Sequence, residues 1–275
     1  MLRIAVAGCP LSTPKPGGTV EGLKHAKKLG IDAMEIEWVQ NVPSDPARMA
    51  DIRKTAESLD MALTVHAPYY VNLNTQDPDK LLASKGRVWK ALQMAELAGV
   101  VSVCVHPAFY LGMEPAKAFD NVRRAVEDIL KKKDALFPHV NFALETMGKP
   151  SQFGTLEEVL KISKEFDLYP CVDAAHLFAR SQGKWNTAKE WNEMLDQYEK
   201  ALGKKSLSQM HLHYSGILYG PGGERKHLPF AESEARWQEY LKVLKDRNVG
   251  GVLVCESPAM EEDTILLRQT YDALR

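Results

Sequence analysis

Short apolar segments alternate with longer amphipathic segments along the whole chain. The short segments are rich in β-branched residues, and they occupy residues 2–8, 33–38, 62–67, 101–106, 140–146, 168–176, 208–216 and 251–257. The longer segments repeat their apolar residues with the spacing of an α-helix, and they occupy residues 18–30, 46–60, 80–99, 116–133, 155–166, 187–202, 234–247 and 262–274. The pattern predicts eight strands and eight helices in alternation.

This alternation favours an α/β fold, a (β/α)8 TIM barrel. Strands that are apolar throughout suit a parallel sheet covered on both faces, and eight strand–helix units favour closure into a barrel. A chain of 275 residues with 45% hydrophobic content can bury one large core, and no linker rich in Pro, Gly or Ser divides it. We therefore expect a single domain over residues 1–275, with an open doubly wound sheet as the alternative.

The charge composition excludes a basic field over the whole surface. The formal net charge is -1, from 35 basic and 36 acidic residues, so any phosphate ligand must be bound by local charge. The first residues lack the pattern of a signal peptide, and no apolar stretch reaches the length of a membrane span. We expect a soluble, cytoplasmic protein without a membrane partner; the composition says nothing of its oligomeric state.

The cysteines give no sign of a disulfide framework or of a metal-binding pair. They are far apart in sequence, mostly within the apolar segments, and no two of them form a CxxC motif: Cys9, Cys104, Cys171 and Cys255. We expect them to be small core residues.

A polar residue that can bind a metal ends each of the last six predicted strands. These residues are three histidines and three acids: His66, His106, Glu145, Asp173, His211 and Glu256. In a barrel the carboxyl ends of all strands meet at one mouth, where active sites are built. A polar group there is costly to bury without a partner or a cation, and this set of ligands suits zinc or manganese.

Further candidates lie close to these strand ends. His176 follows Asp173 by three residues, and His227 lies with Glu224 in the segment after the seventh strand. His213 shares a strand face with His211, because side chains alternate with period two, so one of the two is the ligand and the other supports it. We favour His211 as the ligand.

Six segments together resemble the endonuclease IV family of abasic-site DNA endonucleases, within the wider xylose-isomerase-like barrel superfamily. They span nearly the whole chain and read HAPYYVNL from His66, VHPAFYLG around His106, ETMGKPSQFG from Glu145, CVDAAHLFA around Asp173, MHLHYSGI around His211, and CESP around Glu256. Their order and spacing are specific, although no single segment is.

The resemblance implies a phosphodiesterase that uses two or three zinc ions, or manganese, to cut double-stranded DNA at abasic sites. It implies one ion held by His66, His106 and Glu145, and a second held by Glu145, Asp173, His211 and Glu256. It implies a third ion at His176, with His227 and Glu224 as the nearest match to the family's Asp-x-His. Glu145 and Glu256 are then the candidate catalytic residues, and Tyr69 matches a tyrosine that contacts the substrate.

The chain departs from the family in two loops. The Asp-x-His that completes the third zinc site is absent, and residues 224–227 read Glu-Arg-Lys-His instead. After the second strand, where the family carries a basic segment that contacts DNA, residues 38–42 read Trp-Val-Gln-Asn-Val. We expect DNA to be held less tightly or differently here.

Two other functions remain open on the sequence. Glu145, Asp173, His211 and Glu256 alone match the single-metal site of sugar isomerases and epimerases on this barrel. A metal-binding protein that recognises a phosphorylated ligand or nucleic acid without cutting it is the third possibility. The additional histidines favour the nuclease.

Overall fold

The computed structural model describes residues 1–274, apart from the side chains of residues 132, 134 and 135. Its main sheet is parallel and consists of β1 (Leu2–Ala7), β2 (Ala33–Glu37), β3 (Ala62–His66), β4 (Ser102–Val105), β6 (Asn141–Leu144), β8 (Cys171–Asp173), β9 (Met210–Tyr214) and β12 (Gly251–Cys255). The strand order is β6-β4-β3-β2-β1-β12-β9-β8, so the sheet curves round until β8 approaches β6. The predicted (β/α)8 barrel is confirmed, and the open doubly wound sheet is wrong.

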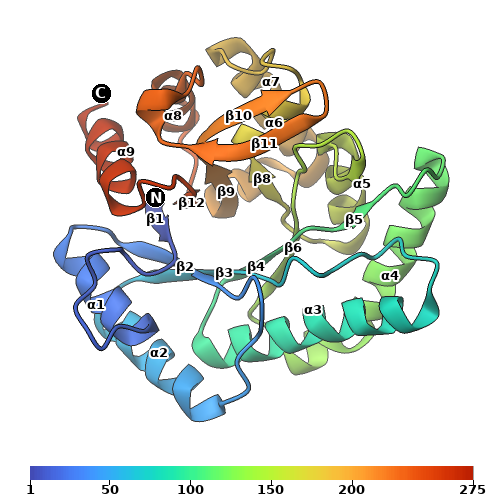
Figure 1. Ribbon diagram of the computed structural model, residues 1–275, viewed down its shortest axis with the longest axis horizontal. Coiled ribbons are helices and arrows are strands. Elements are labelled where there is room, and N and C mark those ends of the chain that lie inside the picture. Colours follow the sequence, from blue (N-terminus) through green and yellow to red (C-terminus); the bar gives the residue numbers. More distant parts are fainter. Residues whose placement is uncertain (275) are drawn as a thin grey trace.

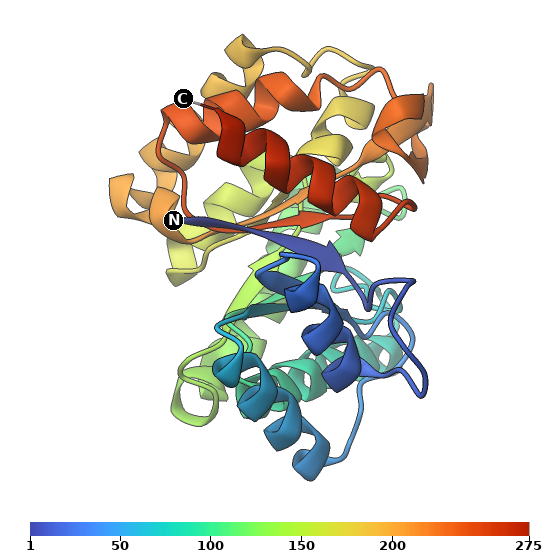
Figure 2. The ribbon, with the colours of Figure 1, turned by 90° about the vertical axis from the view of Figure 1, so that its left-hand side faces the viewer.

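Helices surround the strands, as Figure 1 shows. They are α1 (Thr19–Lys28), α2 (Pro46–Ser58), α3 (Pro78–Ala98), α4 (Pro115–Leu136), α5 (Leu156–Phe166), α6 (Ala174–Arg180), α7 (Ala188–Leu202), α8 (Trp237–Asp246) and α9 (Glu261–Ala273), with short 3-10 helices η1 (Lys204–Gln209) and η2 (Phe230–Glu232). Helix α9 lies against β1, and both termini lie on one side of the molecule (Figure 2). No helix within residues 1–274 is both long and apolar enough to span a membrane.

Helix α6 was not expected, because the apolar segment 168–176 reads as one strand. The strand ends at Asp173, whose side chain accepts a hydrogen bond of 2.7 Å from the backbone N–H of His176. An acceptor at this position satisfies a free N–H of the first helical turn, so the chain turns directly from strand into helix. His176 consequently lies on the first turn of α6, above the strand ends.

The seam between β6 and β8 closes the barrel with little backbone pairing. One isolated bridge joins Glu145 to Cys171 among the described residues. Beside it the side chain of Asn141 takes the place of a neighbouring strand: its amide donates to the carbonyl of Tyr169 at 2.7 Å and accepts from the Tyr169 N–H at 3.1 Å. A side-chain amide thus replaces the missing rung of the sheet.

The large core clusters lie between the strands and the helices, whereas the inside of the barrel is lined by small residues. Ala5, Ala33 and Val254 form one inner cluster, and Cys104 with Cys171 and Ala143 forms another. These side chains leave space inside the barrel for longer polar ones. The expectation that the cysteines are core residues is confirmed for the buried Cys104, Cys171 and Cys255, whereas Cys9 is only partly buried.

Two short pairs of antiparallel strands stand beyond the carboxyl ends of the barrel strands. One joins β5 (Ala108–Phe109) to β7 (Gln152–Phe153), and the other is a hairpin of β10 (Gly216–Gly220) and β11 (Gly223–Leu228). The hairpin is visible in orange above the barrel in Figure 1. It places the segment that contains Glu224 and His227 over the mouth.

Replacing Asn141 by alanine should lower the free energy of unfolding by about 1–3 kcal/mol, because both backbone groups of Tyr169 lose their partner. Urea unfolding of the two proteins measures this difference. Asn41→Ala, at an exposed loop position, is the matched control and should change stability by less than about 0.5 kcal/mol. Equal effects of the two substitutions would show that the side chain of Asn141 does not help close the barrel.

Candidate metal centre

The carboxylate of Glu145 lies at the centre of the mouth and is surrounded by imidazole rings. Its Oε2 atom lies 3.5 Å from His66 Nε2 and 3.0 Å from His106 Nε2. Its Oε1 atom lies 3.3 Å from His176 Nδ1 and 3.6 Å from His213 Nδ1. Glu145 is fully buried, and each of its oxygens faces a different pair of histidines. A carboxylate in this position could serve as a ligand on either side.

Backbone carbonyls orient three of the histidines. His66 Nδ1 lies 2.8 Å from the Ala67 carbonyl, His176 Nδ1 lies 2.9 Å from that of Thr146, and His227 Nδ1 lies 3.1 Å from that of Glu256. A carbonyl oxygen can only accept, so the proton of each neutral ring is on Nδ1. The Nε2 lone pair of each ring is therefore available to a cation.

The structure places His213, not the favoured His211, beside the carboxylates. His213 Nδ1 lies 3.4 Å from Glu256 Oε1, and its group of possible ligand atoms includes Glu145, Asp173 and Glu256. His211 points to the same side of the strand but two residues nearer its amino end, so its ring lies deeper in the barrel, 2.9 Å from Glu35. The period of two correctly limited the choice to these histidines but could not say which is level with the mouth.

The residues at the mouth fit a divalent cation. Glu145 Oε1, Asp173 Oδ2 and His213 Nδ1 are buried and have no hydrogen-bond partner among the described residues, although buried polar atoms ordinarily have one. They belong to one set of ligands, completed by Glu256. Nitrogen and carboxylate ligands of this kind suit zinc or manganese.

Electrostatics also call for positive charge at this position. Burial opposes ionisation of Glu256, but His213 outweighs it and lowers the pKa of that carboxyl to about 2. Burial likewise opposes a charge on His66, yet its hydrogen bond to Glu145 and the charge of that residue raise the pKa of the imidazole to about 10. For Asp173, burial prevails and the pKa lies well above its usual range. Protons on the histidines thus balance the carboxylates, and a cation would take over that role.

The hairpin β10–β11 completes a third set of possible ligands. Glu224 Oε2 lies 3.3 Å from His176 Nε2, and His227 belongs to the same group. The hairpin can approach because Gly148 has no side chain: a Cβ atom there would lie 2.8 Å from Glu224 and 2.9 Å from His176. The structure therefore brings together the three residues suggested for a third ion.

Two acids on β2 were missed in the sequence. Glu35 is fully buried inside the barrel, and Glu37 lies nearer the mouth on the same face. Burial raises the pKa of Glu37 to about 8, although His66 acts in the opposite direction. The signal was available: two carboxylates with period two inside the apolar segment 33–38 need an explanation as much as those at the strand ends.

The mouth opens into a cavity of about 260 Å³, lined by both histidines and aromatic residues. The ring of Tyr69 lies 4.9 Å from that of His66 and 5.1 Å from that of His106, and 50% of the tyrosine is exposed. Phe109 and Lys149 also line this cavity.

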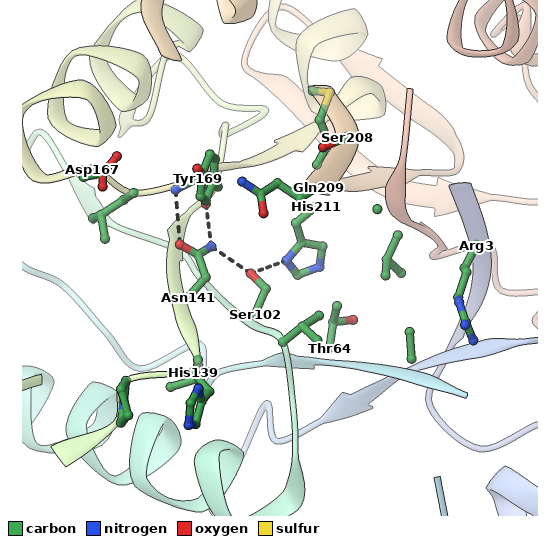
Figure 3. A pocket seen from close by; sticks show the side chains of 18 of the residues that line it. Arg3, Thr64, Ser102, His139, Asn141, Asp167, Tyr169, Ser208, Gln209 and His211 are labelled. Atoms are coloured by element: carbon green, nitrogen blue, oxygen red, sulfur yellow. Dashed lines mark hydrogen bonds between the residues drawn. The ribbon is translucent and has the colours of Figure 1, made fainter. Parts of the chain in front are cut away.

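A larger cavity of about 690 Å³ lies at the opposite, amino end of the strands, where Arg3, Thr64 and Asn141 are found (Figure 3). The candidate metal ligands of the mouth are absent from the described lining of the larger cavity.

Fold and site together define a (β/α)8 barrel protein with a candidate metal centre at the carboxyl ends of its strands. The family model described as xylose isomerase-like TIM barrel matches residues 23–275, and the chain belongs to this family.

The chain is similar to proteins and solved structures that carry different names. The chain is 36% identical over 274 residues to uncharacterized protein MJ0133 of Methanocaldococcus jannaschii, a match that covers 100% of this chain and 98% of that protein. It is 22% identical over 239 residues to a probable endonuclease 4 of Aquifex aeolicus, covering 84% of each. Endonuclease IV of Thermus thermophilus superposes with a TM-score of 0.70 at 19% identity, covering 98% of both chains. A D-tagatose 3-epimerase-like protein superposes with a TM-score of 0.73 at 16% identity, covering 98% of this chain and 96% of that one. These superpositions show the shared fold.

Replacing Glu37 by glutamine should change how the stability of metal-free protein depends on pH. The pKa of Glu37 is about 8 in the folded protein against an ordinary value of 4.5, so the folded state binds this proton more tightly. Its contribution to stability is therefore lost as pH rises from about 4.5 to about 8, by at most about 1.4 kcal/mol per pH unit. Because glutamine does not ionise, the variant should gain stability relative to the parent over this window.

Chemical denaturation in the presence of a chelator, at intervals between pH 5 and pH 9, tests this expectation. Glu234→Gln, which removes an exposed carboxylate, is the control. If the Glu37 and Glu234 variants follow the same curve, Glu37 does not titrate with a raised pKa.

Proposed function

We propose that the protein is a metal-dependent phosphodiesterase that cuts the backbone of double-stranded DNA at abasic sites. The observation that carries this proposal is the position of Glu145, whose two oxygens face different pairs of histidines. A reaction that needs one cation has no use for that arrangement. Similarity to the probable endonuclease 4 of Aquifex aeolicus supports the same function.

The proposed ligands form three adjoining sets. His66, His106 and Glu145 hold one ion; Glu145, Asp173, His213 and Glu256 hold the second; and His176, Glu224 and His227 hold the third. His213 replaces the His211 expected from the sequence. Zinc is the proposed metal, with manganese as the alternative.

Divalent cations bound here would supply a water of lowered pKa and positive charge for the scissile phosphate and the departing sugar oxygen. The protein contributes the position and ionisation of the groups around them. Burial would raise the pKa of Glu145, but the charge of His106 and its hydrogen bond prevail, so this carboxylate stays anionic. The carbonyl contacts of His66 and His176 keep their Nε2 atoms directed at the site.

The rim offers groups that suit a DNA strand. Tyr69 and Phe109 are exposed aromatic side chains beside the cavity, and flat rings of this kind can stack on a base next to a lesion. Lys149 lines the cavity, and Arg225 and Lys226 are exposed on β11. These cations can contact phosphates locally in a chain of net charge -1. An abasic nucleotide is the easiest to turn out of a duplex, because it has no base to unstack.

A sugar epimerase or isomerase is the second candidate. Glu145, Asp173, His213 and Glu256 form one group that could hold a single cation, and the fold is shared with the D-tagatose 3-epimerase-like protein. This function leaves the ligand sets at His106 and at Glu224 with His227 unexplained. The number of ions bound to the active protein separates the two candidates.

Zinc-loaded protein should cut a labelled duplex that contains one abasic site, and it should cut beside the lesion. Removing the ions with a chelator should abolish incision, and Glu145→Ala should slow it by about 100–1000-fold, the scale on which a group that stabilises transition-state charge acts. An undamaged duplex of the same sequence is the substrate control. No incision by the parent protein at high concentration would exclude the nuclease and leave sugar substrates to be tested.

Gly148→Ala should remove the third ion while leaving the fold intact. A methyl group at this position would displace Glu224 and His176, two of the three proposed ligands. Metal analysis of the purified proteins should give about one equivalent less for the variant than for the parent. Gly86→Ala, on α3 with no atom within 4 Å of the added methyl group, should retain the parent's metal content. Equal metal content in the two variants would contradict the proposed third site.

A further inference from the structure

A chain of buried polar groups extends from the mouth through the inside of the barrel. His213 is followed by Glu35, His211, Ser102 and Asn141, and the first three of these five are at most 2% exposed. Asn141, Ser102 and His211 lie in a row, joined by hydrogen bonds, at the edge of the larger cavity (Figure 3). Charged groups are rarely buried so completely unless they are paired or have a function. The contacts among these five residues show what compensates their burial.

The hydrogen positions in this row of five residues can be assigned by starting from Asn141. Tyr169 fixes the orientation of the Asn141 amide. The amide oxygen accepts a hydrogen bond from the Tyr169 N–H, and the amide nitrogen donates one to the Tyr169 carbonyl. The same nitrogen therefore also donates to Ser102 Oγ, at 3.0 Å. Ser102 then directs its own hydroxyl proton to His211 Nδ1, also at 3.0 Å. A neutral His211 consequently carries its proton on Nε2.

Glu35 lies against both histidines. His211 Nε2 donates to Glu35 Oε2 at 2.9 Å, and His213 Nε2 lies 3.0 Å from Glu35 Oε1 in an ion-pair contact. The two Nε2 atoms are 3.2 Å apart, but the protonated nitrogen of His211 cannot accept from His213. The negative charge at Glu35 Oε1, which has no hydrogen-bond partner among the described residues, therefore favours the proton of a neutral His213 ring on Nε2.

We propose that Glu35, held in place by His211, is the positioning residue of the metal centre. Its negative charge, 3.0 Å from His213 Nε2, favours the proton of that ring on Nε2 and so leaves the lone pair on Nδ1, the atom that faces Glu145 and Glu256. A carboxylate behind a metal-binding histidine fixes its tautomer and orientation and makes it a stronger ligand. The inference rests on the metal centre of the proposed function. It gives the buried Glu35 and His211 a role that does not require contact with substrate.

The test measures binding of cobalt(II) alone, by absorption titration of metal-free protein, with no DNA present. Glu35→Gln keeps the size of the side chain but removes the negative charge that faces both rings. It should weaken the binding of one ion by about 10–100-fold, the usual effect of losing such a partner, and should alter the absorption bands of that ion. The other ions should bind as in the parent. Glu35→Asp keeps the carboxylate and should recover part of the affinity.

Two further variants separate this role from a general effect on the barrel interior. Ser102→Ala removes the donor that fixes His211, and it should weaken the same ion in the same direction but less, which keeps the test open if Glu35→Gln does not fold. Thr64→Val is the control, because Thr64 is a buried polar residue inside the barrel outside this chain, and it should bind cobalt like the parent.

Parent-like cobalt affinity and spectrum for both Glu35→Gln and Ser102→Ala would overturn the inference. So would the loss of one whole ion from Glu35→Gln and His211→Ala with the remaining ions unaffected, since these residues would then hold a cation themselves. A parent protein that binds cobalt as described but never cuts DNA would refute the proposed nuclease and leave this inference standing.

Discussion

The burial of negative charge inside a closed barrel is the constraint on which the rest of the structure depends. Glu35, Glu145 and Asp173 are all fully buried, and an ionised carboxylate cannot remain in such surroundings without compensating charge and donors. Histidines from the neighbouring strands provide both, because they can carry charge and can present either nitrogen. The small residues that line the barrel make this possible, since larger side chains would fill the space and exclude the polar groups.

The fold could be predicted from the sequence because it follows from one repeated pattern. Each apolar segment supplied a strand of the barrel, and the residues at the strand ends met at one mouth, since parallel strands all point the same way. The errors in the prediction concern details that the pattern of apolar segments does not determine. The segment 168–176 contains a strand and a helix because the Asp173 carboxylate can cap the first turn, a contact that the apolar pattern does not register.

The site shows the same limit. His211 and His213 differ by one repeat of the strand, so the sequence could not tell which of them lies level with the mouth; that depends on the stagger of neighbouring strands. Glu35 lies in the middle of a strand, whereas the polar residues that end the strands are the ones that the apolar pattern marks as candidates. Glu224 lies close to His176 because the hairpin β10–β11 can approach Gly148, which belongs to a different loop. This contact depends on tertiary structure, so the local sequence could not predict it.

The weakly paired seam between β6 and β8 has a consequence for motion. The one isolated bridge found there among the described residues contains Glu145. The proposed ligands lie on both sides of it: His66 ends β3 and His106 follows β4, whereas Asp173 ends β8 and His213 lies on β9. Spontaneous opening of a barrel begins where the fewest backbone bonds resist it, and here that opening would separate the two groups of ligands. Ions held by both groups would act as cross-links over the weakest line of the sheet. Amide hydrogens along the seam would then exchange with solvent more slowly in the metal-loaded protein, so that metal occupancy would govern the opening of the barrel as well as the proposed chemistry.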